Sequence, residues 1–253
     1  MKERRSDIQV LSAGYRRSGI WNTALDFLFP RRCPFCDEVV RLGDLVCPDC
    51  EKVVSYIGED HCMKCGKPLL DTDSEYCKDC MRTTHLFNRG RALYVYNKAV
   101  RASITRFKYH NRREYATFYG RVMAERLGGF IASCNADCLI PVPISKEKLE
   151  KRGYNQAELL AKSISDHTGI PIDGGLITRV RDTSAMKELT RTERMKNLKG
   201  AFKITSHVVK CKNVIIIDDI YTTGSTIDAM TEVLKKAGAE NVYFVTLAAG
   251  VPV

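Results

Sequence analysis

V-I-I-I-D-D-I-Y-T-T-G-S-T, residues 214–226, joins four β-branched residues to two adjacent acids and then to small hydroxylated residues around one glycine. Four apolar residues without polar alternation are typical of a strand covered on both faces, as in a parallel sheet. From Ser225 onward, apolar residues recur at helical spacing and Gly238 follows as a stop signal. The stretch therefore predicts a strand, a turn and a helix, with Asp218 and Asp219 at the carboxyl end of the strand.

The turn between this strand and helix has the composition of an anion site. In open α/β sheets, ligands bind outside the carboxyl ends of the strands. A phosphate is suited by a glycine, hydroxyl donors, backbone N–H groups and the positive end of a helix dipole. The turn offers Thr222, Thr223, Gly224, Ser225 and Thr226. The two acids repel phosphate, but carboxylates accept hydrogen bonds from sugar hydroxyls and attract metal ions. The predicted ligand thus carries vicinal hydroxyls and a phosphate.

The same stretch resembles the signature of the type I phosphoribosyltransferases. In that family two acids hold the ribose hydroxyls of phosphoribosyl pyrophosphate, and the following loop holds its 5-phosphate. The resemblance implies these roles for Asp218, Asp219 and residues 222–226, with magnesium accompanying the ligand. The alternative is a strand-turn-helix unit whose acids only cap the helix or pair with surface bases. The sequence contains no G-x-x-x-x-G-K-[ST] motif, which disfavours a P-loop nucleotidase.

Composition and charge narrow the function classes. The chain has 253 residues, of which 44% are hydrophobic and 28% charged, as in soluble globular proteins. Forty Lys and Arg against thirty Asp and Glu give a formal net charge of +10, so we expect an anionic partner, either a phosphorylated small molecule or nucleic acid. Apolar runs are too short for a membrane span and the start lacks a signal-peptide core, which predicts no membrane insertion and a cytoplasmic location.

Eight of the eleven cysteines form four C-x-x-C pairs, which in a reducing compartment are more typical of metal sites than of disulfides. The pairs are Cys33 and Cys36, Cys47 and Cys50, Cys62 and Cys65, and Cys77 and Cys80. Two pairs complete one tetrahedral site, so the eight cysteines predict two structural zinc ions without an open coordination position. Consecutive pairing gives two zinc ribbons, and a cross-braced arrangement is the alternative.

The remaining cysteines and the nearby histidines receive simpler interpretations. His61 and His85 lie near the cysteine pairs as spare ligands, but with four cysteines for each ion they are expected to be surface residues. The three unpaired cysteines are expected to be buried thiols: Cys134, Cys138 and Cys211.

Strand and helix patterns alternate along the rest of the chain. Strands are predicted at 91–96, 137–144 and 241–248, and helices at 98–110, 114–131 and 155–167. This alternation predicts an α/β fold of the type I phosphoribosyltransferase kind, with a mostly parallel twisted sheet flanked by helices. The expected division of the chain is a basic tail with an amphipathic helix over 1–30, a double zinc ribbon over 31–85 and a phosphoribosyltransferase domain over 86–253. Trp21, Leu25 and Leu28 form the apolar face of that first helix.

The order of these parts resembles the ComF family, in which a double zinc ribbon precedes a phosphoribosyltransferase domain. Its best-known members serve uptake of transforming DNA in bacteria. Four blocks carry the resemblance: L-F-P-R-R-C-P-F-C at 28–36, R-F-K-Y-H at 106–110, P-V-P-I-S-K-E-K-L-E-K-R-G-Y-N-Q-A-E at 141–158 and L-T-R-T-E-R-M-K-N-L-K-G-A-F at 189–202. The resemblance implies binding of phosphoribosyl pyrophosphate in a protein linked to DNA uptake, and leaves open whether transfer occurs and to which acceptor.

Phosphoribosyl transfer expels pyrophosphate from a sugar carbon that becomes cation-like, so the site needs magnesium and basic side chains rather than a nucleophile. By resemblance, Lys108 belongs to the F-K-Y segment of the family, and Arg152, Asn155 and Gln156 to its R-G-F-N-Q block, here with Tyr154. Lys108 and Arg152 are the candidate catalytic cations. The alternatives are a solvated helix face for the cations and a helix cap for Asn155.

Two features of the segment after 180 bear on turnover. Arg191 and Arg194 belong to a third basic block, which we interpret as a mobile flap. The family often has T-x-x-Q where this chain has T-S-A-M, with Met186 in place of glutamine. This departure leaves the acceptor and the turnover open.

A second function class also fits the sequence. The chain is then a non-catalytic accessory protein of DNA uptake that binds single-stranded DNA or a helicase-like ATPase, and its phosphoribosyl site is a sensor or a relic. Residues 98–113 carry six cations and no acid. Aromatic residues suited to stacking on single strands lie among them, although at this spacing aromatics are more often core: Tyr94, Tyr96, Phe107 and Tyr109. Similar transferases often dimerise, so a homodimer is a further expectation.

Overall fold

The computed structural model describes residues 30–41, 44–71, 73–181, 198, 200–205 and 211–251. The predicted helix within 1–30, the T-S-A-M segment, Arg191 and Arg194 lie outside the described residues. In the described part of the chain, no helix combines the length and the apolar content needed to cross a bilayer.

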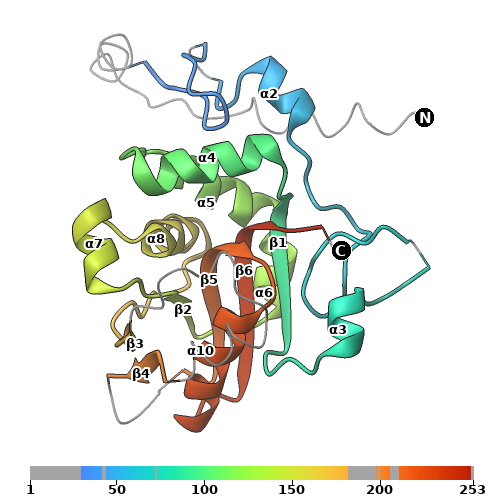
Figure 1. The fold of residues 1–253 in the computed structure, drawn as a ribbon, viewed down its shortest axis with the longest axis vertical. Helices are drawn as coiled ribbons and strands as arrows, with labels where there is room; N and C mark the ends of the chain where they lie inside the picture. The colour runs from blue at the N-terminus through green and yellow to red at the C-terminus, as the bar shows by residue number, and fades with distance from the viewer. Residues whose placement is uncertain are drawn as a thin grey trace.

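A four-stranded parallel sheet forms the centre of the fold, with the strand order β1-β6-β5-β2 (Figure 1). The strands are β1 (Arg89–Val95), β2 (Cys138–Pro141), β5 (Asn213–Tyr221) and β6 (Asn241–Ala249). Strand β5 has a neighbour on each side, and residues 214–217 are fully buried. A strand that is covered on both faces has no place for polar alternation, which explains its unbroken apolar run.

Helices cover both faces of this sheet. They are α4 (Lys98–Tyr109), α5 (Tyr115–Arg126), α6 (Gly128–Ser133), α7 (Lys146–Arg152), α8 (Gln156–Thr168) and α10 (Ser225–Lys236). Ile215 and Ile217 of β5 belong to one buried cluster with residues of α4, α5 and α8. Val214 and Ile216 belong to a second cluster with residues of α10. Because successive side chains of a strand point to opposite faces, β5 contributes to both cores. The predicted α/β class with a parallel sheet is confirmed.

Two details of the fold differ from the sequence prediction. The single helix predicted over 114–131 is wrong, because α5 ends before Leu127 and α6 begins at Gly128. Two successive glycines follow the break, and glycine weakens a helix interior. The patterns also do not predict the short antiparallel hairpin of β3 (Ile177–Arg179) and β4 (Phe202–Ile204).

Two cysteine-containing modules pack against the sheet and its helices. The first ribbon, residues 32–54 with α2 (Pro48–Val53), lies across α4, and the second ribbon, residues 61–82 with α3 (Lys78–Arg82), lies beside β1 (Figure 1). The segment between them adds to the edge of β1, where the Ile57 N–H donates to the Leu93 carbonyl at 2.9 Å. This pairing covers part of an edge that is otherwise open to other strands.

Candidate ligand site and zinc sites

The eight paired cysteines form two clusters in consecutive order. The clusters are Cys33, Cys36, Cys47 and Cys50, and Cys62, Cys65, Cys77 and Cys80. Within each cluster all four sulfur atoms lie within 4.8 Å of one another. The Sγ atoms of Cys36 and Cys47 are 3.6 Å apart, and those of Cys65 and Cys77 are 3.7 Å apart. A tetrahedral zinc ion with Zn–S bonds of about 2.3 Å requires sulfur atoms about 3.8 Å apart, so both clusters fit structural zinc. The cross-braced alternative is wrong.

Asp218 and Asp219 lie near the end of β5, which continues to Tyr221. Asp218 is paired in register with Thr246 of β6, and the N–H of Val142, just after β2, donates to the neighbouring Ile217 carbonyl at 2.9 Å. Three strands therefore meet at this edge of the sheet. Burial, followed by the negative charge of Asp219, raises the pKa of Asp218 to about 7. At neutral pH, Asp218 is therefore close to half protonated.

The loop after β5 encloses a small hollow of about 40 Å³, lined by Asp218 and residues 220–227. Gly224 is the N-cap of α10 with a φ of 79°, and no side chain caps the helix start. An uncapped start leaves the first N–H groups without intrahelical acceptors, which is the arrangement that binds phosphate. The hydroxyls of Thr223 and Ser225 lie 3.0 Å apart in the same loop. The predicted strand, turn and helix are confirmed.

Lys108, in the last turn of α4, reaches these acids. Its Nζ lies 2.7 Å from Oδ2 of Asp219, and the exposed fractions of the two side chains are 20% and 13%. Burial works to lower the pKa of Lys108, but the carboxylates of Asp219 and Asp218 outweigh it, and the pKa is raised. Lys108 is therefore a fixed positive charge beside the acids, as expected for one of the candidate cations.

Arg152, at the end of α7, lies near this ion pair. Its guanidinium donates to Oε1 of Gln156 at 2.8 Å and to the Tyr109 hydroxyl at 3.1 Å, and it stacks 4.8 Å from the centroid of the Tyr109 ring. The charge of Arg152 works against the raised pKa of Lys108 without reversing it. The structure thus brings together both cations that the sequence singles out.

Asn155 and Gln156 connect α8 to the strand end. The Asn155 Oδ1 accepts from the Ala157 N–H at 3.1 Å, and its Nδ2 donates to the Val142 carbonyl at 3.0 Å. The helix-cap interpretation is therefore confirmed, and both polar atoms of Asn155 are engaged within the protein. Gln156 is buried, and its Nε2 has no hydrogen-bond partner within the described residues.

A further cation near the acids comes from the unpredicted hairpin. The positive charge of Arg179, at the end of β3, works to lower the pKa of Asp218. Its guanidinium also lies 5.6 Å from the centroid of the Phe202 ring. In the sequence, a single arginine after a three-residue strand is not distinguishable from a solvated surface cation, so this neighbour of the acids could not be identified there.

Comparison with known proteins gives two domain matches and several relatives that match most of the chain. A double zinc ribbon domain matches residues 24–81, and a phosphoribosyl transferase domain matches residues 149–251. Competence protein F of Haemophilus influenzae is 27% identical over 226 residues, which cover 85% of this chain and 95% of the relative. The two domain matches lie in this order along the chain, and the relative is matched over nearly its whole length. The chain resembles the ComF competence proteins over most of its length.

Other relatives match over a similar extent. Competence protein ComFC of Streptococcus pneumoniae is 29% identical over 205 residues, 78% of this chain and 84% of the relative. DNA utilization protein YhgH of Salmonella typhi is 28% identical over 216 residues, 83% of this chain and 86% of the relative. These relatives match most of the chain, and the two domain matches include both cysteine clusters and the loop after β5.

Much of the basic stretch at 98–113 contacts the first ribbon. Arg106 donates to the Phe35 carbonyl, and Arg112 pairs with Asp37. Lys98, Arg101 and Arg113 are the cations of this stretch that are exposed. The stretch is therefore less available to an external anion than its composition predicts.

The aromatic residues of the same region divide in a similar way. Tyr94 and Phe107 are fully buried, so the core interpretation is confirmed for them and they offer no stacking surface. Tyr96 is half-buried, and Tyr109 is exposed beneath the guanidinium of Arg152.

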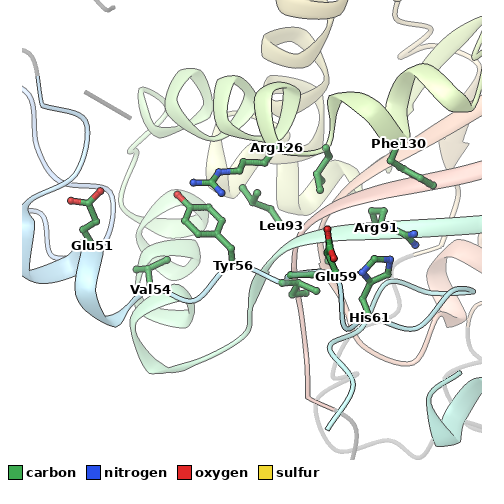
Figure 2. A pocket seen from close by; sticks show the side chains of 13 residues that line it. Glu51, Val54, Tyr56, Glu59, His61, Arg91, Leu93, Arg126 and Phe130 are labelled. Atoms are coloured by element: carbon green, nitrogen blue, oxygen red, sulfur yellow. Dashed lines mark hydrogen bonds between the residues drawn. The ribbon is translucent and has the colours of Figure 1, made fainter. Parts of the chain in front are cut away.

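A second hollow of about 690 Å³ lies away from the acids, between the segment that joins the ribbons, β1 and the corner of α5 and α6 (Figure 2). Figure 2 shows Arg126 beside Tyr56, with its guanidinium carbon 4.4 Å from the ring centroid. Arg91 lies 5.1 Å from the centroid of Phe130 in the same way. Two glutamates also line this hollow. Two pairs of cation and ring thus face a hollow that shares no residue with the loop after β5.

His85 is not a surface residue, so that prediction is wrong. It is 5% exposed, and its Nδ1 lies 2.7 Å from Oδ2 of Asp228. His61 is half-buried and its Nδ1 lies 2.8 Å from the Gly58 carbonyl. Within the described residues neither histidine joins a cysteine cluster. Of the unpaired cysteines, Cys134 and Cys138 are buried as predicted, whereas Cys211 is half-buried.

Proposed function

We propose that the hollow beside Asp218 binds phosphoribosyl pyrophosphate together with magnesium. The observation that carries the proposal is the meeting of two acids, a small hollow and an uncapped helix start at the carboxyl end of the central strand. In the proposed complex, Asp218 and Asp219 accept hydrogen bonds from the ribose hydroxyls, and residues 222–226 hold the 5-phosphate. The matched phosphoribosyl transferase domain includes this loop, which supports the same assignment.

The neighbouring cations supply the charge that the pyrophosphate group requires. Lys108 and Arg179 act directly on the acids, and Arg152 lies near Lys108. Fixed cations stabilise the negative charge that develops on a leaving pyrophosphate. Magnesium, when bound with the ligand, neutralises further charge on the phosphate oxygens. The contribution of the protein to phosphoribosyl transfer is therefore positioning and electrostatic stabilisation.

The ion pair between Lys108 and Asp219 also affects how the ligand enters. A ribose hydroxyl that hydrogen-bonds to Asp219 competes with the Lys108 ammonium for the carboxylate oxygens. We infer that Lys108 turns from Asp219 towards the pyrophosphate as the ribose binds. This exchange keeps the half-buried lysine paired with a negative charge, because an unpaired charge away from water is costly.

Calorimetric titration of the zinc-loaded protein with phosphoribosyl pyrophosphate tests this proposal. We expect binding that strengthens by about tenfold, or about 1.4 kcal/mol, when magnesium is present. Ribose 5-phosphate is the matched ligand control, because it keeps the 5-phosphate but lacks the pyrophosphate that magnesium contacts. It should bind more weakly and respond little to magnesium. An absence of heat with phosphoribosyl pyrophosphate, or equal binding of both ligands, contradicts the proposal.

We further propose that the protein acts in DNA uptake, whether or not it transfers the phosphoribosyl group. The relatives are named competence proteins and DNA utilization proteins, which supports this cellular role. The second candidate function is a non-catalytic one, in which the protein binds single-stranded DNA or a helicase-like ATPase and the phosphoribosyl site acts as a sensor or a relic. The second hollow favours contact with a single strand, because pairs of arginine and aromatic rings suit its phosphates and bases.

Fluorescence anisotropy with a labelled oligothymidine tests the second candidate. Replacing both arginines of the second hollow, Arg91→Ala with Arg126→Ala, is expected to weaken binding by about tenfold at low salt and to flatten its salt dependence. Lys146→Ala with Lys236→Ala is the control, since it removes the same charge from two exposed side chains. Equal weakening by both double variants means that only net charge matters, and then the hollow is not the DNA site.

A further inference from the structure

The segment that follows the second ribbon is hydrogen-bonded to the first turn of α10. The His85 side chain is fully buried, and its Nδ1 lies 2.7 Å from Oδ2 of Asp228. The backbone N–H of Leu86 donates to the other oxygen, Oδ1, at 2.9 Å. Asp228 belongs to α10, and its own side chain is 8% exposed. Both oxygens of one buried carboxylate are therefore held by two neighbouring residues from outside the transferase-like sheet.

The same histidine supports the loop that precedes α10. A Cβ atom placed on Gly224 would lie 2.8 Å from Cε1 of His85 and 2.7 Å from the Tyr221 hydroxyl. Real Cβ atoms do not approach other atoms this closely, so residue 224 is held between the His85 ring and Tyr221 with space for glycine alone. The His85 ring thus packs against Gly224, in the loop that we propose to hold the 5-phosphate.

The second ribbon in turn fixes His85. The rings of His85 and Phe87 stack with centroids 4.8 Å apart. The Phe87 carbonyl accepts a hydrogen bond from Nζ of Lys64, which in the sequence lies between two cysteines of the second cluster. Lys67 pairs with Asp79 of α3 at 2.6 Å, and its Nζ lies 5.7 Å from the centroid of Tyr221. Cys62, Cys65 and Cys77 belong to the same buried cluster as Tyr221 and Ile227. A continuous set of contacts therefore runs from the second cysteine cluster to both ends of the loop.

The first ribbon contacts a different wall of the site. The Ser103 hydroxyl of α4 donates to the Pro34 carbonyl, and Arg106 donates to the Phe35 carbonyl. Asp37 accepts from the Tyr115 hydroxyl at 2.6 Å. The first two contacts hold α4, whose last turn carries Lys108, and the third holds the start of α5. The two ribbons therefore support separate parts of one site, α4 with its lysine and α10 with its loop.

We propose that the second ribbon positions the phosphate loop, and that His85 is the positioning residue through which it acts on Asp228. The proposal rests on the proposed function only for its effect on phosphoribosyl pyrophosphate. Its mechanical part, the link between the second cysteine cluster and the loop, does not depend on any ligand. The corresponding role of the first ribbon is to seat Lys108, which makes the two zinc sites separable by experiment.

Substitution of His85 tests the hydrogen bond separately from packing. His85→Asn keeps a donor for Asp228 in place of Nδ1, whereas His85→Phe keeps the ring but donates nothing. We expect His85→Phe to exchange the amide hydrogens of residues 222–228 about tenfold faster and to bind phosphoribosyl pyrophosphate about tenfold more weakly. His85→Asn should remain within about threefold of the wild type in both measurements. His167→Ala, at an exposed histidine of α8, is the control and should change neither.

Zinc-ligand variants complete the test, with zinc content measured for each. Cys80→Ser is expected to speed amide exchange at 222–228 but not in α4, and Cys47→Ser the reverse. Equal exchange in both regions for both variants, or a normal loop in His85→Phe, overturns the proposal. If either cysteine variant unfolds as a whole, the histidine series alone decides. If the wild type binds no phosphoribosyl pyrophosphate while the exchange results hold, the proposed function fails and the positioning role stands.

Discussion

Replacing both acids of the candidate site, Asp218→Asn with Asp219→Asn, is expected to abolish binding of phosphoribosyl pyrophosphate. Each carboxylate accepts a hydrogen bond from a ribose hydroxyl in the proposed complex, and hydrogen bonds to charged groups contribute about 1.5–3 kcal/mol each. Loss of two such bonds weakens binding by about 3 kcal/mol or more, which is more than about 100-fold. Calorimetry in the presence of magnesium, side by side with the wild type, measures this loss.

The folded state of the double variant needs its own check, because Asp219 is the partner of Lys108. An asparagine at 219 still offers a carbonyl oxygen to the lysine, and removal of two adjacent buried charges relieves their repulsion. We therefore expect native circular dichroism and full zinc content. Glu158→Gln with Asp166→Asn is the control, since it removes two acids from exposed positions of α8. Unchanged affinity in the folded Asp218 and Asp219 variant excludes the acids as ligand contacts.

The parts of the site that the sequence predicts are those determined by neighbours in the chain. The apolar run at 214–217, the acids and Gly224 follow one another directly, so strand, turn and helix could be predicted together. The zinc clusters are similarly local, because each C-x-x-C pair needs only the next pair along the chain. The cap at Asn155 also acts on the N–H of a residue two positions on.

The contacts that could not be predicted from the sequence join residues far apart in the chain. His85 reaches Asp228 over a separation of 143 residues, and nothing in the sequence near a lone histidine indicates a buried carboxylate partner. The sequence allows Lys108 a place in the site by resemblance, but its 2.7 Å contact with Asp219 depends on how α4 packs. Arg106 and Arg112 show the opposite case, since their charges are engaged by the first ribbon rather than offered to a partner.

Asp218→Asn alone is expected to stabilise the folded protein at pH 8, on the order of 2 kcal/mol relative to the wild type. Burial and the charge of Asp219 raise the pKa of Asp218 from 3.8 to about 7. Because the folded pKa lies above the unfolded value, the stability contributed by this group is fully present below about pH 4 and is lost as the pH rises through about 7. Urea unfolding at pH 5, 6, 7 and 8 should show the wild type losing stability relative to the variant.

Protonation of Asp218 is expected to weaken ligand binding, although it stabilises the folded protein. Ribose hydroxyls need the charged form of Asp218 as acceptor, and a carboxyl with a pKa of about 7 is about 90% protonated at pH 6. Affinity for phosphoribosyl pyrophosphate should therefore rise by about tenfold between pH 6 and pH 8, while stability falls. Asp219→Asn is the matched control, because removing the like charge lowers the pKa of Asp218 and moves the stability change to lower pH. A wild type whose stability runs parallel to that of Asp218→Asn would mean that Asp218 titrates normally. If the stability of the wild type instead falls relative to Asp218→Asn, the charged form of Asp218 destabilises the folded protein. A ligand that binds this charged form then explains why the site has a carboxylate at this position.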